Sequence, residues 1–338
     1  MTRPLRGSAC HGVNVYKRML SIVIPTHRRP DLLRACLLAV VRHAPAGREI
    51  IVVDDGSPGE GASRVAEQFA EVRVVRRARQ GGFACAANAG ICASRGDIIE
   101  LLNDDTEVQP GWADAALRRF ADASVAAVAP LVLTWPDGLA IDSAGDRYDL
   151  GGVAGKRGHG ERLTDTYLRP CPVFGASASS GFFRRSALER VGLFPESFDS
   201  YFEDVDLALR LRRAGYQAVF EPASRVLHHV SASYGRAGRR LIERQSCNEE
   251  RVFWRNMPAN VLPRAVPRHL AVLAGKAWRR CQDGTLSPWL AGRLRALCEV
   301  RALLRHRRGL RAITASENVG DWLVEERSIS AWAAGWRG

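Results

Sequence analysis

Short apolar runs alternate with amphipathic segments through the first part of the chain. The runs are rich in Val and Ile, which favour strands, and the segments between them place apolar residues at helical spacing. This alternation is typical of a mostly parallel sheet covered by helices on both faces, so we predict an α/β fold. The predicted strands are LSIVIPT from Leu20, EIIVVDD from Glu49, VRVVR from Val72 and DIIELL from Asp97, and the predicted helices are Pro30–His43, Gly61–Glu71 and Ala84–Ser94.

The pattern continues with a helix over Trp112–Ala121 and an apolar strand, VAAVAPLVL, from Val125. It weakens in the glycine-rich region Gly138–Gly160, where we expect a loop and an edge hairpin. Regular structure resumes near Phe182, and the domain is expected to end at residue 236. Residues 1–18 then form a loose leader, and residues 237–338 form a helical extension.

The net charge of +13 lies mainly in this extension. Residues 236–338 hold 20 Lys and Arg against 9 Asp and Glu, a net of +11, which leaves +2 for residues 1–235. The segment Arg293–Arg311 predicts one basic amphipathic helix that can bind an anionic membrane surface, or that can pack on the main domain with a solvated arginine face. Both interpretations stay open. Its apolar stripe is Leu294, Leu297, Val300, Leu303 and Leu304.

Several classes of protein are not expected from the composition. No run reaches the roughly 18 to 20 uncharged apolar residues of a membrane span, and no apolar signal core precedes Met19. We therefore expect a cytoplasmic protein that can lie at the inner face of the cell membrane. The eight cysteines contain no CxxC pair, so neither a zinc site nor a disulfide framework is predicted. No nucleic-acid recognition module is present, so nucleic acid is not an expected partner.

Two adjacent carboxylates, Asp104 and Asp105, directly follow the strand DIIELL. Side-by-side carboxylates at the exit of a buried strand repel each other unless a cation lies between them. Mg²⁺ or Mn²⁺ suits such oxygens and also binds the oxygens of a substrate diphosphate. The alternative is a solvated turn, because Asn-Asp-Asp-Thr is also ordinary turn composition.

Polar residues also follow the first two predicted strands. Pro25 and Thr26 end one strand, and Asp54 and Asp55 end the next, so a hydroxyl and a carboxylate meet at neighbouring strand ends. This suits recognition of a nucleoside, although a strand-ending turn has the same composition. The segment Gln80–Asn88 opens a helix with two glycines, which allows a phosphate-bearing ligand to approach the backbone. It lacks the GxGxxG pattern, so a dinucleotide cofactor is not predicted, and from it we include Gly82 and Asn88 in the donor site.

Acidic residues begin a predicted helix within Phe198–Tyr216. The helix dipole stabilises Glu203, Asp204 and Asp206 there, and one of them can instead remove a proton from an acceptor hydroxyl. A later strand ends in His228-His229, and an imidazole can complete the shell of a cation held by Asp105.

Six segments in this order resemble the family-2 inverting glycosyltransferases of the GT-A fold, with the closest likeness to rhamnosyltransferase-like bacterial enzymes of surface-polysaccharide synthesis. The resemblance covers residues 20–235. A weaker likeness, through RQSCNEERVFWRNMP, connects the tail to the helical extensions of these enzymes. The six segments are SIVIPTHRRPDLLRACL, IIVVDDGS, GGFACAANAGICASRGDIIELLNDDTEV, SSGFFRRSALERVGLFPESF, YFEDVDLALRLRRAGY and VLHHVSAS.

The resemblance implies a role for each candidate residue. In the donor site, Pro25, Thr26 and Asp55 would hold the nucleoside with Asp54 as support, and Asp104 would approach the ribose or the sugar. For the metal and the acceptor, Asp105 and His228 would bind the cation, with His229 as the adjacent alternative, Asp204 would be the general base, and Glu203 would shape the acceptor site. In place of the usual Gly-Phe-Asp-Glu, this chain has Leu193-Phe194-Pro195-Glu196, so acceptor contacts from that segment are not carried over.

The function implied is inverting transfer of a hexosyl or deoxyhexosyl group from a nucleotide sugar to a saccharide or lipid-linked acceptor, with Mn²⁺ or Mg²⁺ as cofactor. Residues 19–236 would form the catalytic GT-A domain. Two alternatives remain: a catalytically silent subunit that binds a nucleotide sugar, and a nucleotidyltransferase. The second would need a glycine-rich loop near the first strand to hold a triphosphate, and HRRP contains no glycine.

Overall fold

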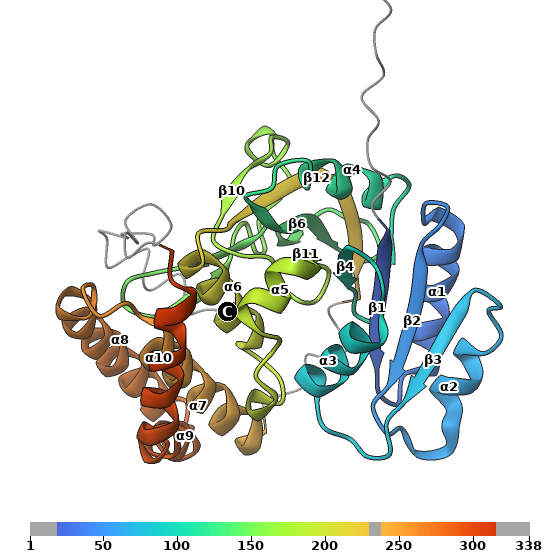
Figure 1. Ribbon diagram of the computed structural model, residues 1–338. Coiled ribbons are helices and arrows are strands. Elements are labelled where there is room, and N and C mark those ends of the chain that lie inside the picture. Colours follow the sequence, from blue (N-terminus) through green and yellow to red (C-terminus); the bar gives the residue numbers. More distant parts are fainter. Residues whose placement is uncertain (1–18, 230–237, 316–338) are drawn as a thin grey trace, which may run out of the picture.

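The computed structural model describes residues 19–229 and 238–315 and contains a curled, mixed central sheet (Figure 1). Along the sheet the strand order is β10-β12-β6-β11-β4-β1-β2-β3, with β5 paired to β12 and β7 paired to β6. A separate pair of strands, β8 and β9, forms a small antiparallel hairpin. The strands are β1 Leu20–Thr26, β2 Glu49–Asp54, β3 Val72–Arg76, β4 Ile98–Leu101, β5 Thr106–Val108, β6 Val125–Thr134, β7 Ile141–Ser143, β8 Asp146–Tyr148, β9 Ala154–Lys156, β10 Cys171–Val173, β11 Phe182–Arg184 and β12 Gln217–His228.

The first half of the sheet is parallel, as the sequence predicts. Strand β1 pairs with β2 and β4, and β2 pairs with β3. Successive side chains of β1 enter opposite layers, because Ile22 and Ile24 belong to one buried cluster and Val23 to another. Helices α1 (Pro30–His43) and α2 (Gly61–Ala66) cover the first layer, and α3 (Phe83–Ala93) covers the second (Figure 1).

The second half of the sheet changes direction. Strand β11 runs antiparallel between β4 and β6, and β12 then runs parallel to β6. The last residues of β12 also pair with the short strand β5, with His228 opposite Thr106. This register brings the end of β12 to the residue that follows Asp105.

Most predicted elements before residue 230 are confirmed, with boundary shifts. The helix Pro30–His43 has the predicted limits, and the Gly138–Gly160 region contains the β8–β9 hairpin. The helix predicted over Gly61–Glu71 ends at Ala66, and Phe69 packs into the cluster beneath α1. The other helices of this part are α4 Trp112–Arg119, α5 Arg185–Val191 and α6 Glu203–Arg213.

The C-terminal part consists of helices α7 (Arg239–Asn256), α8 (Leu262–Gln282), α9 (Leu286–Cys298) and α10 (Val300–Ile313). The prediction of one helix over Arg293–Arg311 is wrong, because the chain turns at Glu299. The Glu299 carboxylate binds the guanidinium of Arg251 on α7 at 2.5 and 2.8 Å, which fixes this corner. No helix among the described residues has an apolar stretch long enough to cross a bilayer.

The predicted boundary at residue 236 lies outside the described residues and stays a prediction. The two parts that it separates nevertheless share a hydrophobic core. Phe198 and Leu209 from the sheet side pack in one buried cluster with Val252 and Phe253 from α7. The sheet and the C-terminal helices are therefore stabilised together.

A buried ionic cluster centred on Asp206 joins α6 to α7. Asp206 is completely buried and accepts hydrogen bonds from Arg210 Nε at 2.8 Å and Asn256 Nδ2 at 2.6 Å, while Arg255 Nε lies 3.1 Å away. Burial alone would raise the pKa of Asp206, but Arg255 and Arg210 outweigh it and lower the pKa to about 2. Ionised Asp206 is thus matched to two buried cations.

We predict that Asp206→Ala lowers the free energy of unfolding by about 3–5 kcal/mol, because Arg210 and Arg255 lose their buried partner. Urea unfolding followed by circular dichroism measures the change. Since the folded pKa is depressed, this stabilisation is complete above the unfolded pKa of about 3.9 and is lost as the pH falls toward 2. The exposed control Asp114→Ala on α4 should change stability by less than about 1 kcal/mol, and an equal loss in both variants would contradict the prediction.

Candidate functional site

The carboxyl ends of β1, β2 and β4 bring together the polar residues that the sequence singles out. Thr26 Oγ1 donates a hydrogen bond of 2.6 Å to Asp104 Oδ2, so the ends of β1 and β4 are directly linked. Asp104 and Asp105 are 5% and 1% exposed. Burial is the main cause that raises the pKa of Asp104 to about 6.

The two aspartates that follow β2 have different surroundings. Asp54 is completely buried and accepts hydrogen bonds from the backbone N–H of Ser57 (2.8 Å) and the hydroxyl of Ser63 (2.6 Å), so it fixes the turn. Asp55 accepts hydrogen bonds from the N–H groups of Gly81 (3.1 Å) and Gly82 (2.8 Å) and pairs with Arg77. Asp55 therefore holds the segment over residues 80–82, which we call the glycine loop, beside the strand ends.

His228 connects Asp105 to a second buried aspartate. Its Nε2 lies 3.2 Å from Asp105 Oδ1, and its Nδ1 lies 3.0 Å from Asp142 Oδ2. Burial lowers the pKa of His228, but its contacts with the two carboxylates outweigh this effect and raise the pKa to about 9. His229 points elsewhere, with Nε2 2.8 Å from Glu107 and its ring stacked on Trp135. Of the two histidines, it is His228 that faces Asp105.

Asp142 itself is held by further cations. Lys156 Nζ lies 2.9 and 3.0 Å from its two carboxylate oxygens, and His159 Nδ1 lies 3.4 Å from Oδ1. Burial would raise the pKa of Asp142, but its hydrogen bonds with His159 and His228 and the charge of Lys156 hold it well below the usual range. Asp142 therefore stays ionised and fixes the ring of His228.

Arg29 places a cation on the opposite side of the carboxylates. Its Nη1 lies 2.9 Å from Asp105 Oδ2 and 3.6 Å from Asp104 Oδ1. Among the described residues, no group of three or more His, Cys, Asp or Glu side chains is arranged to hold a metal ion. Asp105 and His228 nevertheless supply an oxygen and a nitrogen ligand, and Asp142 orients the imidazole as the outer-shell partners of metal-binding histidines do. This donor set fits a cation that completes its shell with oxygens of a bound ligand.

Asp204 lies on the other side of one loop from the Asp104-Asp105 pair. It is the second residue of α6, and its Oδ2 accepts hydrogen bonds from Ser177 Oγ and the N–H of Ala178, both at 3.2 Å. The carbonyl of Ser179, in the same loop, accepts a hydrogen bond of 2.8 Å from the N–H of Asn103. The loop over residues 177–180 thus joins both acidic sites.

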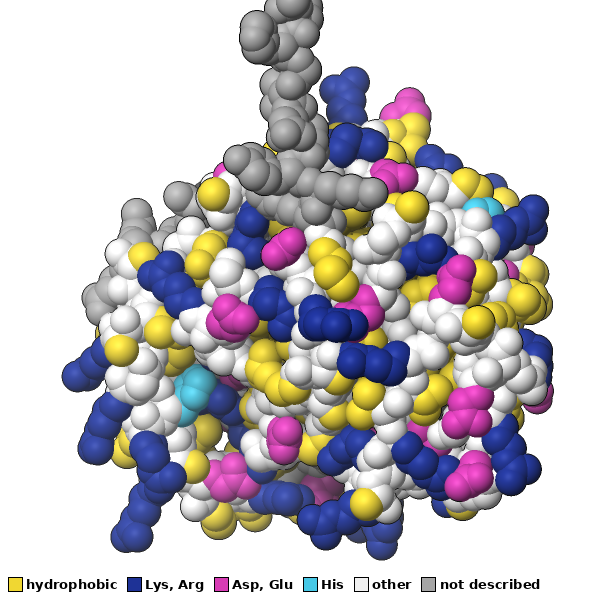
Figure 2. Space-filling model, turned by 45° about the vertical axis from the view of Figure 1, so that its right-hand side comes forward, with side chains coloured by type: hydrophobic (Ala, Val, Ile, Leu, Met, Phe, Trp, Pro, Cys, Tyr) yellow, Lys and Arg dark blue, Asp and Glu magenta, His cyan; other side chains and the backbone are white. Residues whose placement is uncertain are grey.

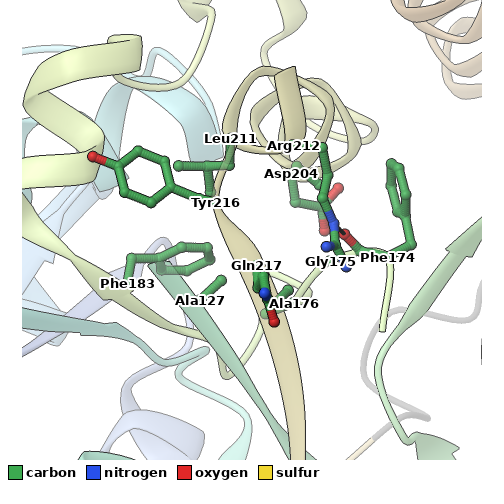
Figure 3. A pocket seen from close by; sticks show the side chains of 12 residues that line it. Ala127, Phe174, Gly175, Ala176, Phe183, Asp204, Leu211, Arg212, Tyr216 and Gln217 are labelled. Atoms are coloured by element: carbon green, nitrogen blue, oxygen red, sulfur yellow. Dashed lines mark hydrogen bonds between the residues drawn. The ribbon is translucent and has the colours of Figure 1, made fainter. Parts of the chain in front are cut away.

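Two carboxyl groups close to Asp204, those of Asp146 and Glu203, have higher pKa values than free carboxylic acids. Burial and the charge of Asp204 raise the pKa of Asp146, on β8, to about 8. The same two causes raise the pKa of Glu203, which is 6% exposed and has no hydrogen-bond partner for Oε2. Figure 3 shows Phe174, Gly175 and Arg212 beside Asp204. These residues help to line a small pocket of about 10 Å³, roughly the space that one water molecule needs.

A strained turn precedes α6. Asp199, Tyr201 and Phe202 all have positive φ angles, of 63°, 74° and 69°, which non-glycine residues rarely adopt. Asn248 on α7 is completely buried, and its Nδ2 lies 2.9, 3.2 and 3.0 Å from the carbonyl oxygens of Phe198, Ser200 and Tyr201. The C-terminal helices therefore hold this turn in place.

The same turn touches the glycine loop. The carbonyl of Asp199 accepts a hydrogen bond of 2.9 Å from the N–H of Ala84, and a Cβ atom added to Gly82 would overlap the Asp199 side chain.

Asn88 lies on α3, and its amide binds the backbone N–H and carbonyl of Phe194 at 3.0 and 2.9 Å. Because both ends of its amide are used in this way, we leave Asn88 out of the site proposed below.

Sequence reasoning missed Arg29, Arg77, Asp142, Asp146 and Lys156. The first two belong to basic clusters, HRRP and RRAR, whose partners cannot be identified from the sequence. The other three come from the glycine-rich region that the sequence predicts only as loop and hairpin. In that region the single sequence signal of a site is the segment DSAGD, in which Asp142 and Asp146 lie on either side of a short turn.

A comparison with protein families decides which family this arrangement belongs to. Residues 21–192, half of the chain, match the model of glycosyl transferase family 2. The chain belongs to this family. The matched range contains the glycine loop, the Asp104-Asp105 pair and Asp142, and it ends before α6.

Relatives of this family 2 chain include glycosyltransferases of *Mycobacterium tuberculosis*. The chain is 30% identical over 213 residues to the pre-mycofactocin glycosyltransferase (62% of this chain, 43% of that protein). It is 32% identical over 212 residues to N-acetylglucosaminyl-diphospho-decaprenol L-rhamnosyltransferase (55% and 68%). An uncharacterized protein, y4gI of *Sinorhizobium fredii*, is 34% identical over 236 residues (64% and 25%). The alignments thus span less than half of the first and third of these relatives.

Solved structures with the same fold are GT-A glycosyltransferases. The mannosyltransferase PcManGT of *Pyrobaculum calidifontis*, solved with GDP-Man and Mn²⁺, has a TM-score of 0.54 at 18% identity and covers 84% of this chain and 88% of its own. GalNAc-T7, solved with UDP, GalNAc and Mn²⁺, has a TM-score of 0.55 at 18% identity and covers 70% and 47%. The predicted GT-A fold is confirmed for this family 2 chain.

We predict that Gly82→Ala destabilises the protein more than Gly192→Ala does. Both glycines have similar backbone angles (φ 84°, ψ 174° and φ 86°, ψ 159°), so both substitutions carry the same backbone strain. A Cβ at Gly192 meets only Arg210 Nη1 at 3.7 Å, whereas one at Gly82 displaces Asp199. The additional loss at Gly82 should be about 1–3 kcal/mol in urea unfolding, and equal losses would mean that the Asp199 turn moves freely.

Proposed function

We propose that this family 2 glycosyltransferase transfers a sugar from a nucleoside diphosphate sugar to an acceptor hydroxyl, with inversion at the anomeric carbon and with Mn²⁺ or Mg²⁺. One observation carries the proposal. The Asp105–His228–Asp142 chain and the Asp204 carboxylate lie on two sides of the loop over residues 177–180. This loop contacts Asp204 through Ser177 and Ala178 and contacts Asn103, the residue before Asp104, through Ser179, which supports a cation site and a base within one site.

The donor would bind across the carboxyl ends of β1, β2 and β4. Pro25, Thr26 and Asp55 would hold the nucleoside, with Asp54 as the fixed support of the turn. In this structure the N–H groups of the glycine loop, including that of Gly82, donate hydrogen bonds to the Asp55 carboxylate. In the complex with the donor, the same loop would face the nucleotide. Asp104, next to Thr26, would accept a hydrogen bond from the ribose or the sugar.

Asp105 and His228 would hold the cation. A bound Mn²⁺ or Mg²⁺ would supply positive charge at the leaving diphosphate, as expected for metal-assisted transfer. The relatives support this choice only indirectly, because PcManGT and GalNAc-T7 were solved with Mn²⁺. Within this chain, Arg29 would add a further positive charge beside the same carboxylates.

Asp204 would be the general base. The pKa values of its neighbours Asp146 and Glu203 are raised by burial and by the charge of Asp204, so these two are less suited to accept the proton as ionised bases. Asp204 is also more exposed than Glu203, which would shape the acceptor side. Attack by the acceptor oxygen breaks the bond from the anomeric carbon to the diphosphate, and the acceptor proton passes to Asp204. A single displacement of this kind inverts the anomeric configuration.

The names of two relatives support a proposal for the acceptor class. One relative is named as a transferase to N-acetylglucosaminyl-diphospho-decaprenol, and another, of *Myxococcus xanthus*, as an O-antigen biosynthesis protein. We propose a saccharide or lipid-linked acceptor and a role in cell-surface polysaccharide synthesis, at the cytoplasmic side of the membrane. Release of nucleoside diphosphate together with a glycosylated product supports this, whereas release of pyrophosphate would indicate a nucleotidyltransferase, and no turnover would indicate a silent subunit.

Asp204→Asn should lower kcat by about 10²–10⁴-fold and leave the affinity for the donor nearly unchanged, because the amide cannot accept the proton. The measurement is nucleoside diphosphate release at saturating donor and Mn²⁺, with donor affinity from calorimetry. Asp165→Asn, at an exposed aspartate that begins a short 3-10 helix, is the control and should behave as the wild type. Near-normal turnover of Asp204→Asn would show that another group is the base.

Asp142→Asn should weaken Mn²⁺ affinity by about 10–100-fold, because the neutral amide holds the imidazole of His228 less firmly. The electron paramagnetic resonance signal of free Mn²⁺, titrated in the presence of a nucleoside diphosphate, measures this affinity without turnover. Asp105→Ala removes a ligand and should weaken Mn²⁺ binding further. If Asp142→Asn bound Mn²⁺ as well as the wild type, Asp142 would have no part in orienting His228.

A further inference from the structure

Exposed large hydrophobic side chains gather in the C-terminal helices. Seven of the twelve in the described part of the chain belong to α8, α9 and α10. On α9, Leu290, Leu294 and Leu297 are 43%, 62% and 55% exposed, and their spacing of four and three residues places them on one face. The others are Leu270 (57%) and Trp278 (70%) on α8, and Val300 (52%) and Leu304 (50%) on α10.

Helices α9 and α10 pack on α7, and α8 packs against α9 (Figure 1). The exposed side chains named above lie on the other sides of these three helices. Lys276 of α8 and Arg293 of α9 are directed inward, where they pair with the buried Glu249 on α7. Gly292 allows the close approach of α9, because a Cβ there would meet the backbone of α7. With Arg293 directed inward, Arg295 is the single other charged residue of α9, so the leucine face has no charge of its own.

A strongly basic region borders this leucine face. Residues 262–313 contain 12 Lys and Arg but only Asp283 and Glu299 as acidic residues, a net of +10. Both acidic residues are paired, Asp283 with Arg279 at 3.7 Å and Glu299 with Arg251. On α10 the exposed side chains include Arg301, Arg305, Arg308 and Arg311. By contrast, the face in Figure 2 mixes Lys and Arg with Asp and Glu.

We propose that the outward faces of α8, α9 and α10, which we call the apolar–basic face, dock on an anionic lipid bilayer. An apolar helix face with flanking arginines is the pattern of a helix that lies in the membrane interface. The leucines would enter the boundary between headgroups and acyl chains, and the arginines would contact anionic headgroups. Nucleic acid would explain the arginines but not the exposed leucines.

Charge also separates a membrane from a second copy of the chain. A symmetric dimer through the apolar–basic face would place two surfaces rich in exposed arginines, among them Arg301, Arg305 and Arg308, against each other, and like charges across an interface are strongly unfavourable. An anionic bilayer offers both the apolar layer and the opposite charge. The proposal goes beyond the transfer reaction and does not depend on it.

Vesicle flotation tests the proposal with phosphatidylcholine vesicles that do or do not contain phosphatidylglycerol. The wild type should bind the anionic vesicles at least about tenfold more tightly, and salt should weaken this binding. The triple variant that carries Leu290→Ser, Leu294→Ser and Leu297→Ser should bind anionic vesicles at least about tenfold more weakly than the wild type. The variant Arg301→Gln, Arg305→Gln, Arg308→Gln should lose the preference for anionic vesicles.

Matched controls use equally exposed residues elsewhere. The double variant Leu38→Ser, Leu168→Ser removes leucines that are 57% and 44% exposed. The double variant Arg64→Gln, Arg95→Gln removes two exposed arginines. Neither double variant should change vesicle binding. Donor hydrolysis in solution, measured on every variant, should stay at the wild-type rate, so failure of the docking surface is distinguishable from failure of the proposed reaction. Equal vesicle binding by the serine variant and the wild type would overturn the proposal.

A second measurement does not require the triple variants to fold. Brominated lipids should quench the fluorescence of the wild type in anionic vesicles, and Trp278→Phe should remove part of that quenching. Identical quenching in both proteins would place α8 away from the bilayer and overturn its part in the face.

Light scattering tests the alternative occupant, a second copy of the chain. A wild type that is dimeric, and that becomes monomeric when the three leucines are changed to serine, would show an interface between copies and overturn the proposal.

Discussion

The site depends on burying several carboxylates within a few ångströms of one another. Two unit charges about 5 Å apart repel by about 3 kcal/mol at an effective dielectric constant of 20, so buried neighbours cannot all stay ionised without cations. The protein separates them by environment. His228 and Arg29 outweigh burial and lower the pKa of Asp105, while burial raises that of Asp104 to about 6. The contact between His228 and Asp105 therefore decides which carboxylate of the pair carries the charge.

The same division recurs on the other side of the loop over residues 177–180. Asp146 is buried, and burial together with the charge of Asp204 raises its pKa to about 8. Asp204 accepts two hydrogen bonds from the loop, which fix the position of its carboxylate. Pairs of carboxyl groups with diverging pKa values are the usual sign of divided roles in catalysis. Here Asp105, whose pKa is lowered, lies next to Asp104, whose pKa is raised, and Asp204 lies next to Asp146, whose pKa is raised.

The strained turn before α6 connects the segment of Gly82 to the start of α6, where Asp204 lies. Three non-glycine residues with positive φ each cost on the order of 1 kcal/mol or more, and such a conformation persists only when its surroundings fix it. Asn248 binds the turn from behind through three carbonyls, and the Gly82–Ala84 loop contacts it from the front. The C-terminal helix α7 thus helps to fix the turn that leads into α6 and Asp204, and is not only an attached extension.

The sequence predicts those parts of the site that end regular elements. Thr26, Asp55 and Asp105 follow apolar strands, and parallel strands bring their carboxyl ends to one edge, so periodicity alone indicates that they meet. His228 is reached because β12 is a recognisable strand, although its register against β5 is not visible in the sequence.

Residues that act through long-range contacts carry no periodic signal. Asp142 and Lys156 come from an irregular hairpin region, and their pairing with His228 depends on how that region folds over the sheet. The break at Glu299 is similar, because leucine spacing continues through it and only the contact with Arg251 on α7 shows why the helix stops. Local pattern therefore predicts the strand ends, and tertiary contacts decide the charges that surround them.

The orientation of the C-terminal helices is not explained by stability alone. Lys276 and Arg293 pair with Glu249, whose pKa is lowered to about 2 because these cations outweigh the effect of burial. Replacing a buried ionic cluster by apolar residues is often neutral or stabilising, so directing the leucines inward and the arginines outward would cost little. Instead, α9 directs Arg293 inward and three leucines outward, which loses the burial energy of those leucines in the isolated protein. An arrangement that leaves apolar surface exposed while it buries ions is expected where a second apolar phase completes the burial.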